Sequence, residues 1–186
     1  MTATRPNPDM VYDGQRLTWG GIKYKATSGM PALQKPQKQC VSKRGPIPEG
    51  LYYLNVMGEN GEAAEAVVQD WSQCELKPSW RIEDIPRGEE ATHHGIDCER
   101  YWAVWGNYRV RIEPADETTN RKCINKGGKR DGFYIHDSTK GFSHGCIETE
   151  QRFFDRLIQR IGKDQRKLYL KVEYKEGIKT NGGTKK

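Results

Sequence analysis

Short runs of alternating apolar and polar residues dominate the chain, and this two-residue period is typical of half-buried β-strands. The first run, residues 11–19, reads as strand, turn and strand, with Asp13 and Gly14 as the hairpin signal. The clearest run is residues 167–174, where apolar and polar positions alternate strictly. Further strands are predicted at residues 22–26, 51–56, 101–105, 108–112 and 133–136. The chain is therefore predicted to be mainly β.

One firm helix is predicted in the last quarter of the chain. Its apolar side chains recur at helical spacing and share one face: Phe153, Phe154, Leu157, Ile158 and Ile161. We expect Thr149 to be its N-cap and Gly162 to end it. Together these patterns predict a mainly β domain with one firm helix just after residue 146.

A single domain is predicted over residues 11–174, because 186 residues suit one core of ordinary size. Residues 1–10 read as a flexible leader, and the Gly- and Lys-rich residues 175–186 as a disordered tail. Residues 57–100 show no clear period. Within them, residues 63–68 fit either a short helix or part of a long loop.

The composition says little about the binding partner or the cellular compartment of the protein. The net charge of +6 and mean hydropathy of -0.92 favour an anionic partner, but no nucleic-acid motif is present. No apolar run is long enough for a membrane-spanning helix. The first residues lack the apolar core of a Sec signal. We therefore expect synthesis in the cytoplasm and, for any outside role, another export route.

Five cysteines leave the redox state open. An odd count fits one functional thiol, Cys146, and two disulfides among the other four. Those four permit three connectivities, and disulfides would indicate an oxidising place of work. Four reduced thiols are the alternative. The four residues concerned are Cys40, Cys74, Cys98 and Cys123.

The strongest chemical signal is a Ser-His-Gly-Cys run with a second histidine ten positions before the cysteine. Cys146 is the candidate nucleophile, and His136, at the end of a predicted strand, is the candidate general base. We expect a thiolate–imidazolium pair, favoured further by the N-terminus of the helix that follows. Asp137 is the expected partner of the second imidazole nitrogen, through its carboxylate or its carbonyl.

The residues around this pair have expected supporting roles. Backbone amides near Gly145 would form an oxyanion hole. Ser143 and His144 would brace the loop or contact substrate. The neighbouring aromatic residues Tyr134 and Phe142 are candidate substrate contacts.

Two other readings of the same residues stay open. His136 and Cys146 would otherwise be ordinary core or loop residues. Alternatively, they would join the His93, His94 and Cys98 group in a structural zinc site, although such sites prefer short, paired ligand spacings. No cofactor is expected in the leading interpretation.

At this motif the sequence resembles the L,D-transpeptidases, the YkuD-like cysteine enzymes of peptidoglycan. The resemblance rests on His136 and the Ser-His-Gly-Cys run at 143–146, supported by residues 27–29, 47–52 and 105–110 in the expected order. It spans residues 11–174 and implies a β-sandwich or barrel-like fold of the YkuD type, interrupted by an insertion at 57–100. The gap between His136 and residue 143 is shorter than usual, and Glu148 replaces a common Asn or Arg.

The short gap, the small size and the lack of a signal peptide are similar to the L,D-transpeptidase effectors that type VI secretion delivers into rival bacteria. This resemblance implies an antibacterial toxin that acts in the target periplasm. It implies attack by Cys146 on the bond between meso-diaminopimelate and D-alanine in tetrapeptide stems. The outcome would be carboxypeptidase, D-amino-acid exchange or crosslinking activity. A cognate immunity protein and a component of the secretion apparatus are the expected partners.

Rival functions are also consistent with the sequence. One is a peptidoglycan amidase or endopeptidase of the NlpC/P60 or CHAP kind, although in those enzymes the cysteine usually precedes the histidine. Another is a non-catalytic module, stabilised by zinc or binding the cell wall. For the insertion at 57–100, we expect a lid or groove wall tied down by Cys74 and Cys98.

Overall fold

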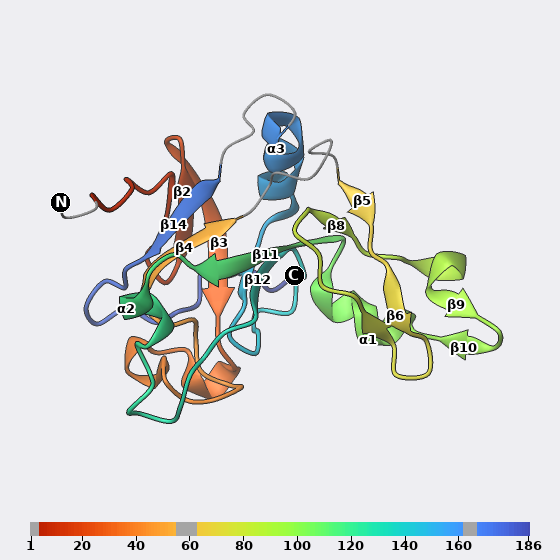
Figure 1. The fold of residues 1–186 in the computed structure, drawn as a ribbon, viewed down its shortest axis with the longest axis horizontal. Coiled ribbons are helices and arrows are strands. Elements are labelled where there is room, and N and C mark those ends of the chain that lie inside the picture. Colours follow the sequence, from red (N-terminus) through yellow and green to blue (C-terminus); the bar gives the residue numbers. More distant parts are fainter. Residues whose placement is uncertain (1–3, 55–62, 162–166) are drawn as a thin grey trace.

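The computed structural model describes residues 4–54, 63–161 and 167–186, and its centre is a closed barrel of eight strands. The order around the barrel is β12, β13, β3, β2, β1, β14, β4 and β11, and pairing of β11 with β12 closes the ring (Figure 1). The strands are β1 Met10–Tyr12, β2 Arg16–Trp19, β3 Ile22–Ser28, β4 Gly50–Leu54, β11 Tyr108–Pro114, β12 Phe133–His136, β13 Ile147–Thr149 and β14 Leu168–Val172. The predicted mainly β fold is confirmed.

The predicted first hairpin is also confirmed, and its turn shows why it forms. Strands β1 and β2 pair in antiparallel fashion across residues 13–15. The Asp13 carboxylate accepts hydrogen bonds from the backbone amides of Gln15 and Arg16, each at 2.9 Å. Such a side-chain bond to the backbone two or three residues later holds a tight turn. The predicted end of another strand, at Val56, lies outside the described residues.

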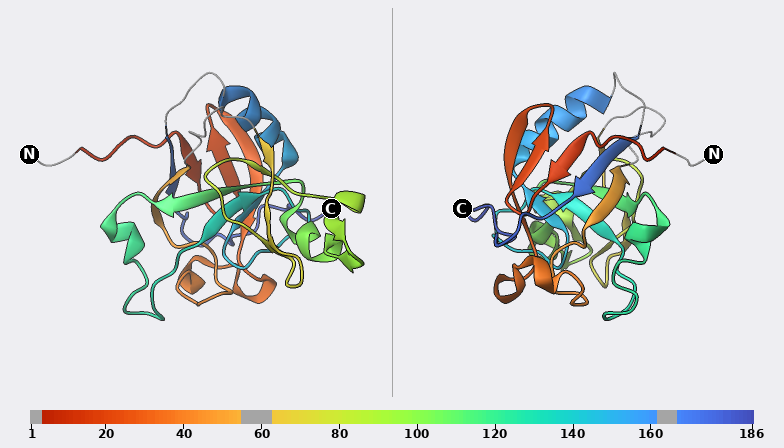
Figure 2. Two further views of the ribbon diagram at one scale, coloured as in Figure 1. Left: turned by 45° about the vertical axis from the view of Figure 1, so that its right-hand side comes forward. Right: turned by 90° about the vertical axis from the view of Figure 1, so that its left-hand side faces the viewer.

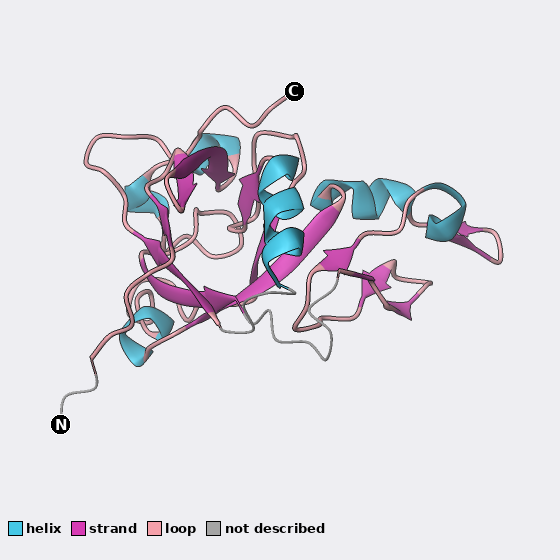
Figure 3. Ribbon diagram, turned by 90° about the horizontal axis from the view of Figure 1, so that it is seen from above, coloured by secondary structure: helices cyan, strands magenta, loops and turns pink. Residues whose placement is uncertain are grey.

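Helix α3 (Gln151–Ile161) buries the face that its sequence predicts. Phe153, Phe154 and Leu157 are fully buried, and the Phe153 ring packs on Trp19 and Tyr24. Seen from above, α3 lies against the barrel strands (Figure 3). Burial of each such aromatic side chain contributes about 1.5–3 kcal/mol. No helix in the described parts of the chain is long and apolar enough to cross a membrane.

The ends of α3 differ from the prediction. Thr149 is not its N-cap, because this residue belongs to β13 and its hydroxyl donates to the Lys25 carbonyl at 2.8 Å. The first turn is instead closed by the Phe153 amide, which donates to the Glu150 carbonyl at 3.0 Å. The predicted stop, Gly162, lies outside the described residues.

A side lobe, defined as residues 63–105, projects from the barrel (Figure 1). It has its own apolar cluster, which includes Leu76, Ile85 and Trp102, and it is tied by the Cys74–Cys98 disulfide. Its strand β8 extends the barrel sheet by pairing with β11. The lobe's regular elements are β5 Ala64–Glu65, β6 Val68–Asp70, β7 Glu75–Leu76, β8 Glu83–Asp84, β9 Thr92–His93, β10 Ile96–Asp97 and α1 Glu99–Trp102.

One prediction about the lobe is wrong, and one of the alternatives left open by the sequence is excluded. Residues 101–105 do not form a strand, because they complete α1 and continue as a 3-10 turn, Ala103–Trp105. Tertiary packing explains the difference. The Trp102 ring lies 5.3 Å from that of Trp71, and its indole N–H donates to the Cys74 carbonyl at 2.8 Å. Residues 63–68 are not helical either, since they contain the short strand β5 and the start of β6.

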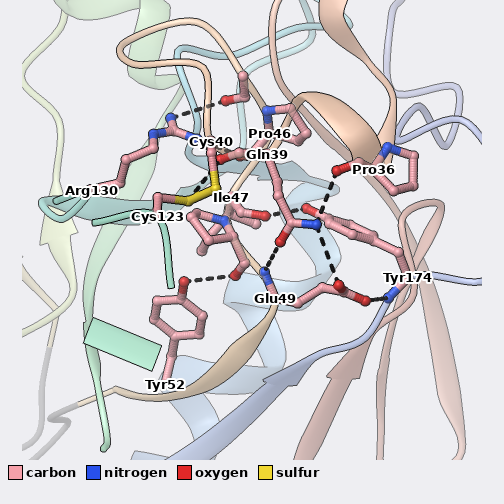
Figure 4. Close-up of a disulfide and its surroundings, with 12 residues drawn as sticks. Pro36, Gln39, Cys40, Pro46, Ile47, Glu49, Tyr52, Cys123, Arg130 and Tyr174 are labelled. Atoms are coloured by element: carbon pink, nitrogen blue, oxygen red, sulfur yellow. Dashed lines mark hydrogen bonds between the residues drawn. A yellow bond between two sulfur atoms is a disulfide. The ribbon is translucent and has the colours of Figure 1, made fainter. Parts of the chain in front are cut away.

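The second disulfide, Cys40–Cys123, joins the segment between β3 and β4 to the segment between β11 and β12 (Figure 4). The same region is held by Arg130, whose guanidinium donates to the carbonyls of Gln39 and Pro46 at 2.6 Å. On the other side, the Gln39 amide side chain contacts Glu49. These bonds make the disulfide-linked loops a firm platform, and short helix α2 (Glu117–Asn120) precedes Cys123 within it.

Residues 175–186 are packed in the structure, so the predicted disorder of this tail is wrong. Thr180 is fully buried and exchanges backbone and side-chain hydrogen bonds with Ser28 at the end of β3. The Gly182 amide donates to the Thr27 hydroxyl at 3.0 Å. Gly182 fits because a Cβ there would lie 2.1 Å from the Gln15 carbonyl. Composition suggested a mobile segment, whereas these buried backbone bonds fix it.

The N-terminal leader leaves the barrel on the side away from the lobe (Figures 1 and 2). Strand β1 begins at the fully buried Met10, the last residue that the sequence assigned to the leader. Arg5 pairs with Asp116 near α2, at 2.6 Å. The Asp9 amide donates to the Tyr169 carbonyl, and the Asp9 carboxylate accepts from the Tyr169 amide, each at 2.8 Å. The described part of the leader is therefore attached at more than one point.

Candidate active site

Strands β12 and β13 run parallel and place the two candidate catalytic residues on neighbouring strands. Register pairs Ile135 with Ile147, so Cys146 lies level with Tyr134 and one residue before β13. Phe133 and Ile135 belong to the barrel core, and alternation therefore turns Tyr134 and His136 to the opposite face. The same alternation along β13 puts Cys146 on that outer face.

His136 is a buried, neutral imidazole. Its Nδ1 atom lies 3.1 Å from the Ser138 hydroxyl, and the Trp105 ring packs edge-on at 5.5 Å. Burial, together with the positive charges of Lys140 and Arg109, lowers the pKa of His136 from its ordinary value to about 3. The imidazole therefore carries no charge at neutral pH in the free protein.

Cys146 is the chain's single free cysteine, and its thiol is also favoured in the neutral form. Sγ accepts a hydrogen bond from the Tyr134 amide at 3.4 Å. Burial raises the pKa of the thiol; the Tyr134 amide and the charges of Arg109, Lys140 and Arg130 act in the opposite direction. The expected thiolate–imidazolium pair is thus not the state that burial favours before substrate binds.

The expected help from the helix dipole is also absent. The three strand residues Ile147–Thr149, followed by Glu150, separate Cys146 from α3. At about 3.3 Å per residue the strand residues alone span roughly 10 Å, whereas the dipole acts within the first turn. The charges of three side-chain cations, which include Arg109, favour the thiolate instead.

One of these cations, Arg109, is held in place by the side lobe. Its guanidinium makes two bonds to the Glu83 carboxylate, at 2.8 and 3.1 Å, and both side chains are buried. The same guanidinium lies over the rings of Trp105 and Tyr134, at 4.6 and 4.5 Å. This bidentate pair connects the lobe to the site and fixes a positive charge there.

The predicted partner of the imidazole, Asp137, has another role. Its Oδ1 atom accepts the backbone amides of Asn107 and Tyr108 at 2.6 and 2.8 Å. A close approach at Gly106 permits this, since a Cβ there would lie 2.5 Å from Asp137. Asp137 therefore anchors the start of β11, and Nδ1 of His136 is left to Ser138.

Ser138 in turn contacts a fully buried carboxylate. Its hydroxyl donates to Oε2 of Glu148, which also accepts the Lys140 amide at 3.2 Å. Oε1 of Glu148 accepts the Gly141 amide at 2.8 Å. Sequence reasoning missed both residues as partners of His136. Their only signal is position, since Ser138 follows the histidine by two residues and Glu148 follows the cysteine by two.

The Ser-His-Gly-Cys loop is braced as predicted for Ser143. Its hydroxyl donates to the Cys146 carbonyl and accepts the amides of Gly29 and Gly145 at 3.1 and 3.3 Å. Gly145 is required here, because its φ is 113° and a Cβ would lie 2.5 Å from Arg130. Its amide is engaged with Ser143, so the predicted oxyanion-hole role would need that bond to open.

The other predicted contacts lie around the site. Exposed His144 has Nδ1 3.3 Å from the Lys43 carbonyl and lines a cavity of about 510 Å³ together with Lys43, Lys129 and Arg130. Phe142 is half-buried with the Lys140 ammonium 4.7 Å from its ring. Tyr134, in contrast, is buried and contributes its backbone amide rather than an open ring.

The zinc interpretation loses one of its ligands, because Cys98 forms a disulfide with Cys74. In the lobe, the His93 ring stacks on Trp71, and the His94 ring packs edge-on against His93. No group of three metal-ligating side chains occurs among residues 4–54, 63–161 and 167–186. Of the three connectivities that the sequence left open, the structure has Cys40–Cys123 with Cys74–Cys98.

The raised thiol pKa gives a pH prediction for the free protein. Because burial shifts the Cys146 pKa above the ordinary value of 9.0, the thiolate should form only as the pH passes 9.0. We expect the rate of alkylation of Cys146 by iodoacetamide to keep rising above that pH. The control is the same chain in urea with its disulfides intact. A midpoint below that of the unfolded chain would contradict the prediction.

The fold and the site together define a closed β-barrel domain that carries a buried histidine close to a single free cysteine. The family follows from comparison with known sequences. The model of the Tlde1 domain matches residues 22–172, so the chain belongs to the Tlde1 domain family, which is a family of type VI secretion effectors. A comparison with curated proteins finds none that matches this chain.

Proposed function

We propose that this effector domain is a cysteine acyltransferase that acts on the tetrapeptide stems of peptidoglycan. The observation that carries the proposal is the position of Cys146. The single free thiol of the chain lies in the hydrogen-bonded Ser-His-Gly-Cys loop just before β13, and buried His136 lies at the end of the neighbouring strand β12. A cysteine with an imidazole nearby is the arrangement of nucleophilic acyl transfer.

In the proposed reaction, Sγ of Cys146 attacks the carbonyl carbon between the third and fourth stem residues. The thiol proton passes to Nε2 of His136 as the carbon–sulfur bond forms. The carbon–nitrogen bond then breaks, and the imidazolium returns the proton to the amine of the leaving D-alanine. Water or another amine attacks the thioester, loses a proton to His136, and releases the thiol when that proton reaches sulfur.

A neutral resting pair suits this sequence of steps, since the proton moves as the nucleophile attacks. Negative charge then develops on sulfur and on the carbonyl oxygen. Arg109, Lys140 and Arg130 are the cations whose fields already favour the thiolate form of Cys146. Fixed positive charges in a buried site stabilise such developing charge without reorganising.

The place of work and the partners are part of the same proposal. We infer delivery into the periplasm of target bacteria, where oxidising conditions would preserve the Cys40–Cys123 and Cys74–Cys98 disulfides. A component of the secretion apparatus and a cognate immunity protein would be the protein partners. The membership of the Tlde1 domain family supports this route.

Mass spectrometry of digested stems tests the proposed function. Oxidised protein incubated with isolated tetrapeptide stems is expected to remove one alanine residue, or to replace it when another D-amino acid is supplied. The Cys146→Ala variant is expected to leave the stems unchanged. Cleavage at a different bond would indicate an amidase or endopeptidase, and stems left intact by the active protein would contradict the proposal.

A further inference from the structure

We propose that Ser138 and Glu148 are positioning residues that hold His136 in the tautomer with its proton on Nδ1. That tautomer leaves the lone pair of Nε2 free to accept the thiol proton of Cys146. The expected effect on rate rests on the proposed acyl transfer, whereas the tautomer itself is a property of the free protein.

The geometry is a buried chain of three side chains. Nδ1 of His136 lies 3.1 Å from the Ser138 hydroxyl, which donates to Oε2 of Glu148. The exposed fractions of the three residues are 3%, 3% and 0%. Water therefore does not compete for these groups, and each hydrogen bond has to be made within the protein.

Each oxygen of the Glu148 carboxylate faces one backbone amide, which can only donate, and one hydroxyl. Oε1 faces the Gly141 amide and the Thr184 hydroxyl, and Oε2 faces the Ser138 hydroxyl and the Lys140 amide. An ionised carboxylate accepts all four of these bonds, whereas a carboxylic acid would have to turn one of the two hydroxyls into an acceptor. The surroundings thus fit the charged acceptor.

Proton counting then decides the tautomer. A serine hydroxyl has one proton to donate, and the proton of Ser138 is committed to Glu148. The hydroxyl oxygen of Ser138 can therefore only accept from Nδ1 of His136, which places the ring proton on Nδ1. The reverse tautomer would need a second hydroxyl proton.

The loop after His136 and the C-terminal tail both hold Glu148 in place. The amides of Lys140 and Gly141 come from the loop after His136, and Thr184 comes from the packed tail. The tail thus contacts the third member of the chain directly. No other carboxylate among the described residues contacts Ser138, since Asp137 is bonded to the start of β11.

The tautomer is tested by long-range ¹H–¹⁵N correlation spectra of the imidazole rings in oxidised, full-length protein. Substitution of the histidines at 93, 94 and 144 assigns the signal of His136. We expect the Nδ1–H pattern in the unmodified protein and in Ser138→Thr, which keeps the hydroxyl. Ser138→Ala should shift the ring toward the Nε2–H form. An Nε2–H ring in the unmodified protein, or no response to Ser138→Ala, would overturn the inference.

Kinetics on tetrapeptide stems supply the second readout. With Ser138→Ala we expect kcat to fall by at least about 10-fold with little change in KM, toward the roughly 10⁴-fold cost of a wrong tautomer in a serine protease. Ser138→Thr should restore most of the rate. A changed tautomer with unchanged kcat would overturn the positioning role. If the unmodified protein were inactive on stems, the proposed function would fail while the spectra still decided the tautomer.

Discussion

Replacing His136 with alanine is expected to lower the rate of acyl transfer by about 10²–10⁴-fold, the usual contribution of a positioned general base. The reason is that burial raises the pKa of the half-buried Cys146 thiol and so favours its neutral form, and an attack without the imidazole then lacks an acceptor for the thiol proton. The rate is measured as release of D-alanine from tetrapeptide stems under single-turnover conditions.

The Ser-His-Gly-Cys loop supplies a matched control for this experiment. His144 is also a histidine close to Cys146, but it is exposed and its contact is to the Lys43 carbonyl at 3.3 Å. We expect His144→Ala to reduce the rate far less than His136→Ala. The opposite order would show that the base has been wrongly assigned, even if both variants fold.

Removing the Cys40–Cys123 disulfide is expected to cost about 4.5 kcal/mol of unfolding free energy by the chain-entropy estimate. The bridge closes a loop with a sequence separation of 83 residues, whereas Cys74–Cys98 closes one of 24. The same estimate gives about 3.4 kcal/mol for the shorter loop. Denaturant unfolding of the paired Cys→Ser variants measures both values.

The two disulfides should also differ in their effect on activity. Cys40 and Cys123 support the platform in which Arg130 donates to Gln39 (Figure 4). Arg130 also lies close to Gly145, the residue before Cys146. Loss of this bridge is expected to reduce activity along with stability. If the variant without Cys40–Cys123 were more stable than the variant without Cys74–Cys98, the expected order of the two stabilities would be contradicted.

Much of the barrel and the main site residues could be predicted from the sequence because their signals are local. Alternation marked β14, and helical spacing marked the buried face of α3. The turn chemistry of Asp13 marked the first hairpin. Likewise, Cys146 and His136 stood out because a nucleophile and a base within ten residues form a compact motif. Their roles as nucleophile and base remain predictions.

The errors fall where distant residues decide the local structure. The strand predicted at residues 101–105 is helical because Trp102 packs on Trp71 and bonds to Cys74 in the lobe. The tail that read as disordered is fixed by bonds to β3, which lies about 150 residues earlier in the chain. No local pattern carries this information.

The sequence by itself determined the β-rich class, the helix after the motif, and the pairing of a cysteine with an upstream histidine. The tertiary structure alone decided that the sheet closes into a barrel, that Ser138 and Glu148 lie in a hydrogen-bonded chain with His136, and that burial opposes the charged forms of His136 and Cys146. The physical reason is that periodicity and motifs report neighbours along the chain, whereas burial, charge and proton sharing depend on neighbours in space.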